Sequence, residues 1–158
     1  MEQEIDNLET TYDICLSRGM YLESDDLDFE LIKDLNGSCE RNLKALKELS
    51  NLVKKDSGVP EILLRGYYSL LNKMIRTFIL FDKVYTEDDK AANAFVCLKH
   101  PELEFEWESL ETLRLRLNSS DFRGQVLSID EYSRFKLQID LGISTLKNKI
   151  DSKMKELQ

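Results

Sequence analysis

The stretch from Pro60 to Lys83, PEILLRGYYSLLNKMIRTFILFDK, decides the fold of this chain. Its apolar side chains are too numerous for one narrow stripe of a helix: Leu63, Leu64, Tyr67, Leu70, Leu71, Met74, Ile75, Phe78, Ile79 and Phe81. A helix that is apolar around most of its circumference is contacted from several sides. We therefore predict a long central helix over about 60–83, in the core of an all-α protein.

Two helices are expected before this one. Apolar residues at helical spacing predict an additional N-terminal helix over 1–20, with Gly19 as its end. A second helix, from about Asp28 to Lys54, is indicated by the stripe Ile32, Leu35, Cys39, Leu43, Leu46 and Val53. Gly37 weakens that helix by roughly 1 kcal/mol relative to alanine.

The segment after the central helix contains further start and stop signals. Thr86–Asp89 resembles a capping box that opens a shorter helix, which His100-Pro101 ends. Another helix is expected to begin at Trp107, and the polar stretch Asn118–Gly124 is expected to be irregular. A capping box at Ser128 then predicts the start of the last helix.

These elements predict one antiparallel helical bundle of four to six helices, occupying 1–158 as a single domain. No strand alternation is apparent. The composition, 42% hydrophobic and 33% charged, is typical of a globular protein. No run of about 20 apolar residues predicts a membrane span. Because no secretion signal opens the chain, we expect it in the cytoplasm.

The chemistry-bearing residues give little sign of catalysis. The only histidine, His100, is expected to be a partly exposed residue at a helix end, and it excludes multi-histidine metal sites. The scattered cysteines Cys15, Cys39 and Cys97 predict buried thiols rather than a disulfide framework or zinc site. The acidic clusters are typical of caps and solvated faces, and Tyr67-Tyr68 of packing. We expect no metal and no cofactor.

The net charge of −8 argues against a broad nucleic-acid footprint, since phosphate binding requires clustered Lys and Arg. A local basic patch remains compatible with it.

Four segments together resemble the HEPN family of small helical bundles. They are Ser38–Leu49, Gly66–Leu71, Val84–Asp88 and the signature segment Leu113–Gly124. The likeness covers about 28–150, the HEPN-like core, and leaves the first helix outside. It implies a homodimer formed through long helices, with a small nucleotidyltransferase-type protein, RNA or a nucleotide as possible partners.

Catalytic members of that family are ribonucleases with Arg, four to six residues, and then His. Here Arg116 can fill the arginine place, with Asn118 nearby, but the histidine place falls at Phe122 or Asp121. Phenylalanine cannot titrate, so the resemblance implies a ribonuclease motif that is absent or degenerate.

Three functions therefore compete. The first is a non-catalytic HEPN-like binding module, in which the arginines around the signature turn bind an anion; the ligand-binding candidates are Arg114, Arg116, Asn118 and Arg123. The competing interpretation of these arginines is that they pair with the many carboxylates. The second function is a weak or altered ribonuclease that uses Arg116, and the third is a purely structural scaffold.

Overall fold

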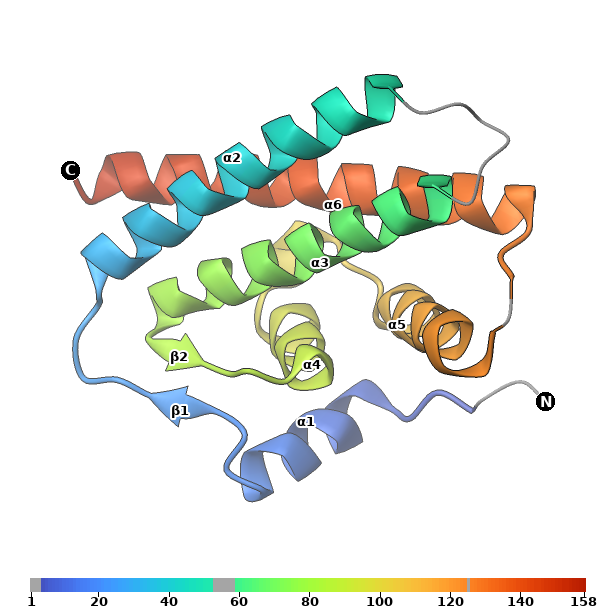
Figure 1. Cartoon of the computed structure of the whole chain (residues 1–158). Coiled ribbons are helices and arrows are strands. Elements are labelled where there is room, and N and C mark those ends of the chain that lie inside the picture. Colours follow the sequence, from blue (N-terminus) through green and yellow to red (C-terminus); the bar gives the residue numbers. More distant parts are fainter. Residues whose placement is uncertain (1–3, 53–58, 125) are drawn as a thin grey trace. The chain divides into compact units, whose positions relative to one another are not determined.

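The computed structural model describes residues 4–52, 59–124 and 126–158, without the side chains of 59, 60 and 119–123. Within this part the chain is all-α, as predicted, and forms a helical bundle (Figure 1). The helices are α1 (Leu8–Ser17), α2 (Phe29–Leu52), α3 (Val59–Ile79), α4 (Asp89–Lys99), α5 (Trp107–Arg123) and α6 (Ile129–Glu156), with 3-10 turns η1 (Leu80–Asp82) and η2 (Pro101–Leu103).

One small sheet was not predicted. The strands β1 (Leu22–Glu23) and β2 (Val84–Tyr85) pair antiparallel, with Leu22 opposite Tyr85. Strands of two residues are too short to produce a visible alternation in the sequence.

The chain divides into two compact units. The first comprises residues 1–28 and 75–125, and the second comprises 29–74 and 126–158. Helix α3 contributes its first residues, through Met74, to the second unit and its last turn to the first. The single domain over 1–158 stays a prediction.

In the second unit, α2 and α3 run antiparallel. The hydroxyls of Ser50 and Tyr67 lie 3.0 Å apart, and Lys73 Nζ donates to Ser38 Oγ at the other end of the pair. Between these contacts, Gly66 allows α3 to approach α2: a Cβ built there would lie 2.7 Å from a methyl carbon of Leu46.

Helix α6 completes the second unit. Near its C-terminal end it meets α2, where Asn36 Nδ2 lies 3.5 Å from Asp151 Oδ1. Near its N-terminal end it meets α3, where Lys136 Nζ lies 3.9 Å from the centre of the Tyr67 ring. Its buried apolar side chains recur every three or four residues, the spacing of one helix face: Phe135, Ile139, Ile143, Leu146 and Ile150.

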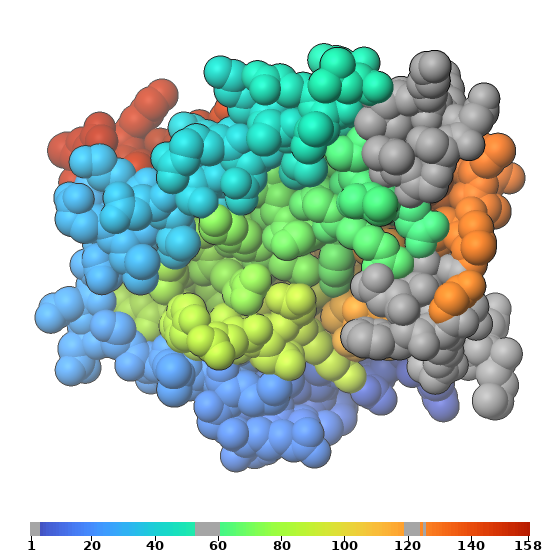
Figure 2. All heavy atoms as spheres, in the orientation of Figure 1, coloured from blue at the N-terminus to red at the C-terminus, as the bar shows by residue number. Residues whose placement is uncertain are grey.

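The prediction for α3 is confirmed. Nine of its apolar side chains are buried: Leu63, Leu64, Tyr67, Leu70, Leu71, Met74, Ile75, Phe78 and Ile79. Part of the helix nevertheless reaches the surface, as the green atoms in Figure 2 show, and Ile62 is 68% exposed. The α-helix ends at Ile79, and the expected last turn is the 3-10 turn η1, followed by Lys83 at φ 60°.

The first unit corrects one boundary and confirms another. Helix α1 begins at Leu8, later than expected, because the Asn7 side chain accepts a hydrogen bond from Thr10 N and caps the helix there. Gly19 ends it as predicted, at φ 66°, the left-handed conformation that favours glycine.

Three further boundaries test the start and stop signals. The N-cap of α4 is Asp88, not Thr86; the Asp88 carboxylate accepts from Ala91 N at 2.7 Å. Helix α5 continues through Arg123, so the expectation of an irregular Asn118–Gly124 is wrong, and the break comes at Gly124 with φ 65°. The Ser128 cap of α6 is confirmed by its bond from Glu131 N.

Candidate functional site

The predicted anion-binding residues all fall on α5, in the first unit. Arg114 and Asn118 are four residues apart and share a face of this helix. Arg116 points about 160° away from Arg114, because successive residues turn by about 100°. One ligand on one face of α5 therefore does not meet both Arg114 and Arg116. The side chains of Asp121, Phe122 and Arg123 lie outside the described residues, so their predicted roles stay predictions.

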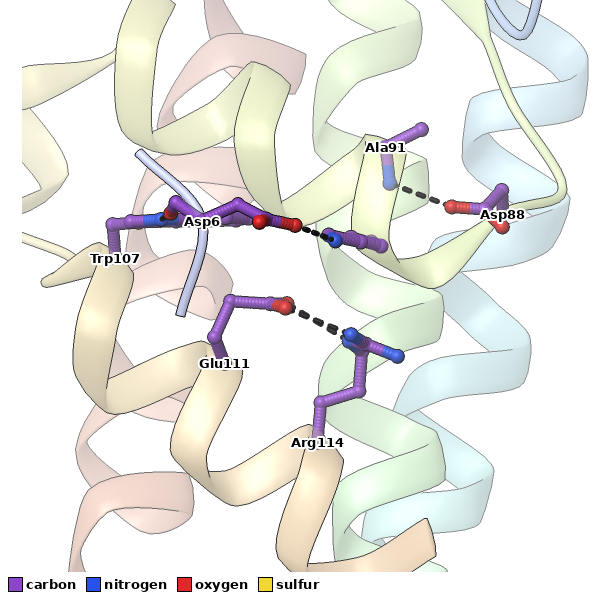
Figure 3. A network of polar contacts seen from close by, with 7 residues as sticks. Asp6, Asp88, Ala91, Trp107, Glu111 and Arg114 are labelled. Atoms are coloured by element: carbon purple, nitrogen blue, oxygen red, sulfur yellow. Dashed lines mark hydrogen bonds and ion pairs between the residues drawn. The ribbon is translucent and has the colours of Figure 1, made fainter. Parts of the chain in front are cut away.

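Arg114 forms the clearest polar contact of the first unit. Its Nε and Nη2 donate to the two carboxylate oxygens of Glu111, each at 2.8 Å (Figure 3). Glu111 is 2% exposed, whereas the Arg114 side chain is 17% exposed. A guanidinium and a carboxylate in this two-bond geometry form a strong, directional pair. The carboxylate needs it, because an unpaired buried charge costs several kcal/mol.

Glu111 was not among the site residues predicted from the sequence. It lies one turn after the buried Trp107 and next to the buried Leu110, so it occupies a position where the apolar stripe of α5 predicts a hydrophobic residue. The sequence contains a pattern that could have indicated it: a charged residue at a core position of the helix, three residues before an arginine. It indicates that one of the four ligand-binding candidates is paired with a carboxylate, as the competing interpretation held.

Two more charged groups, on α3 and α4, form an ion pair in the same unit. Asp89, at the start of α4, lies 3.8 Å from Arg76 Nη2. Burial raises the pKa of Asp89, while the positive charges of Arg76 and, more weakly, Arg114 lower it. We refer to four residues whose charges alternate in sign as the polar seam: Arg76, Asp89, Arg114 and Glu111. Its formal charge is zero.

A second polar contact ties the residues before α1 to α4 and α5. The Trp107 indole N–H donates to the Asp6 carbonyl oxygen at 2.8 Å, and the Asp6 carboxylate pairs with Lys90 at 2.9 Å (Figure 3). The Lys90 ammonium lowers the pKa of Asp6. Residues 4–7, which the sequence assigned to the first helix, therefore lie before α1, and Asp6 fixes them to α4 and α5 through these two contacts.

Two other side chains of α4 lie on the same face as Asp89. Asn93 and Cys97 follow it at intervals of four residues, and both are buried. Burial, and then the charge of Glu111, raise the pKa of Cys97 to about 12. The thiol is therefore protonated at neutral pH and a poor nucleophile. Neither amide atom of Asn93 has a hydrogen-bond partner among the described residues.

His100 is held in place by carboxylates. Its Nδ1 lies 2.8 Å from Glu102 Oε1, and its Nε2 lies 2.5 Å from Asp82 Oδ2. The ring meets Phe78 edge-on, with centroids 4.8 Å apart. Both ring nitrogens are thus occupied by contacts that link η1 to η2. This geometry indicates a structural role, in which His100 stabilises the end of α4 and the two 3-10 turns beside it.

The prediction of buried thiols is confirmed, since Cys15, Cys39 and Cys97 are all buried. In the parts of the chain that the structure covers, no group of three His, Cys, Asp or Glu side chains could hold a metal ion. No helix there has both the length and the apolar character needed to span a membrane. No protein-family model, curated protein or solved structure matches the chain.

Proposed function

We propose that this chain is a non-catalytic, HEPN-like interaction module that binds a protein partner through its acidic first unit. The family assignment is part of the proposal and depends on the resemblance of the four segments described above. The protein partner is favoured over RNA or a nucleotide by the distribution of charge.

The distribution of charge between the two units is the observation that carries this proposal. The first unit contains 19 Asp and Glu against 8 Lys and Arg, a formal net charge of −11, whereas the second contains 11 against 14, or +3. The candidate arginines all belong to the acidic unit, and Arg114 is neutralised by Glu111. A phosphate backbone would be repelled there, while a basic protein surface would be attracted.

Matched charge variants test the partner. Asp13→Asn, Glu104→Gln and Glu108→Gln together remove three exposed charges from the first unit; Asp34→Asn, Glu40→Gln and Glu48→Gln remove three from the second. We expect affinity capture from the source cells at about 0.15 M salt, where exposed charges still interact over about 8 Å, to lose the partner with the first variant and keep it with the second. Equal capture by both variants contradicts the proposed surface.

A ribonuclease assay tests the absence of catalysis. Pure protein and an Arg116→Ala variant are incubated with mixed-sequence RNA, and the products are separated by gel electrophoresis. We expect no cleavage that depends on Arg116. Cleavage by the wild type that is lost in the variant would show that the chain is an altered ribonuclease instead.

The homodimer remains a separate part of the proposal. Light scattering coupled to size-exclusion chromatography measures the mass directly. A mass of about twice 18.5 kDa is expected, and a strict monomer removes the dimer without affecting the charge argument.

A further inference from the structure

Asn93 is a buried polar side chain whose burial is not explained by any hydrogen bond to the described residues. It is 1% exposed, and both its amide nitrogen and its amide oxygen lack hydrogen-bond partners among the described residues. In native proteins, the great majority of buried side-chain polar atoms are bonded to protein or to ordered water. Two unbonded atoms on one buried amide therefore indicate a missing partner that can both accept and donate.

The position of Asn93 relative to the polar seam shows what surrounds it. On α4 it lies one turn after Asp89 and one turn before Cys97. Asp89 is close enough to Arg114, and Cys97 close enough to Glu111, for the charges on α5 to affect them. Helices α4 and α5 pack against each other in the first unit, so the face of α4 that carries Asp89, Asn93 and Cys97 lies near the Glu111–Arg114 pair.

We propose that the first unit holds one bound water molecule at Asn93, in the polar interior between α4 and α5. A water accepts from Nδ2 and donates to Oδ1, so it satisfies both amide atoms, and about two to four polar partners of this kind are what an internal water needs. An ion at Asn93 would be a buried charge, and the neutral amide has no charge to compensate it.

A crystal structure of the wild type at high resolution tests the site directly. We expect one ordered water within about 3.2 Å of both Asn93 Nδ2 and Oδ1, the hydrogen-bond range. Continuous density with no water at either atom would overturn the proposal.

A substitution pair gives an independent test. Asn93→Leu keeps the number and branching of the side-chain heavy atoms but removes both polar atoms, and Asn42→Leu makes the same helix-interior change at an exposed position of α2. If a water is bound, removing Asn93 strips it of partners, so the urea midpoint of Asn93→Leu should fall below that of Asn42→Leu. A higher midpoint for Asn93→Leu is the result expected of a simply unpaired amide, and it would overturn the site. If Asn93→Leu does not fold, the crystallographic test still decides.

Discussion

At the residue scale, the first unit depends on how Glu111 is compensated. The carboxylate is buried, and Arg114 donates a hydrogen bond to each of its oxygens. Such pairs contribute little net stability compared with apolar residues of the same size, but breaking one leaves a buried charge. The arginine is therefore more important for protecting the fold than for adding energy to it.

We expect Arg114→Met to lower the free energy of unfolding by about 3–5 kcal/mol, because Glu111 is then left buried without its guanidinium. The double variant Glu111→Leu, Arg114→Met removes both charges and should recover most of that loss. Urea unfolding followed by circular dichroism measures both. A single variant that stays within about 0.5 kcal/mol of the wild type would show that the pair is not buried as described.

The Cys97 thiol makes a pH prediction at the same scale. Its pKa is about 12 in the folded protein against an ordinary value of 9.0. The unfolded chain therefore releases this proton first as the pH rises, and the folded state binds it more strongly. The contribution of Cys97 to stability is fully present below pH 9 and is lost between about pH 9 and pH 12, by up to roughly 1.4 kcal/mol per pH unit.

Cys97→Ala should flatten the fall of stability with alkaline pH. Thermal unfolding of wild type and variant, recorded from pH 8 to pH 11, gives the two slopes. Burial also raises the pKa of Cys15 and of Tyr21, so a smaller alkaline decline should remain in the variant. Identical slopes would mean that Cys97 ionises normally in the folded protein.

At the scale of an element, two helix-interior glycines distinguish the effect of helix propensity on stability from the effect of packing. Gly37 in α2 and Gly66 in α3 both weaken their helices by roughly 1 kcal/mol relative to alanine. A Cβ at Gly37 would only approach the tip of Arg41, at 3.4 Å, whereas a Cβ at Gly66 would lie 2.7 Å from a methyl carbon of Leu46. Only Gly66 is required by a close approach of two helices.

We therefore expect Gly37→Ala to raise the free energy of unfolding by about 0.5–1 kcal/mol. Gly66→Ala should leave the free energy of unfolding unchanged or lower it, because Leu46 must shift to admit the new methyl group. Chemical denaturation of the two variants side by side makes the comparison. An equal gain at both positions would contradict the close packing of α2 on α3.

At the scale of the whole molecule, the charge of −8 conceals two units of opposite sign. An excess of like charge destabilises a compact state by self-repulsion, and salt screens the interaction between exposed charges. The acidic unit, at −11, is the part in which this repulsion is concentrated.

Raising NaCl from about 0.01 to 0.15 M, which shortens the screening length from roughly 30 to 8 Å, should therefore raise the melting temperature. The variant Asp13→Asn, Glu104→Gln, Glu108→Gln should show a smaller rise than the control variant Asp34→Asn, Glu40→Gln, Glu48→Gln. Differential scanning calorimetry provides the values. A melting temperature that falls with salt would indicate that ion pairs outweigh repulsion in this protein.

The sequence by itself determined the all-α class, the extensive burial of the apolar side chains of α3, the buried cysteines and the Ser128 cap. These features depend on periodicity and on caps, which involve residues three or four positions apart. Contacts between residues far apart in the chain could not be predicted from the sequence. The N-cap of α4 was predicted at Thr86 but lies at Asp88, because both side chains can accept a hydrogen bond from a helix N-terminus. The predicted start of α1 was too early, because Asp6 is bound to Trp107 and Lys90 instead.

Only the tertiary structure decided which charges are buried. Arg114 looked like an anion ligand because it lies near two other arginines in the sequence, and the helical course of α5 through Arg123 then separated Arg114 from Arg116 by a half turn. Glu111 and Asn93 became informative only once α4 and α5 were seen to meet. Composition fixes how many charged groups a chain has, but their surroundings depend on which helices pack together.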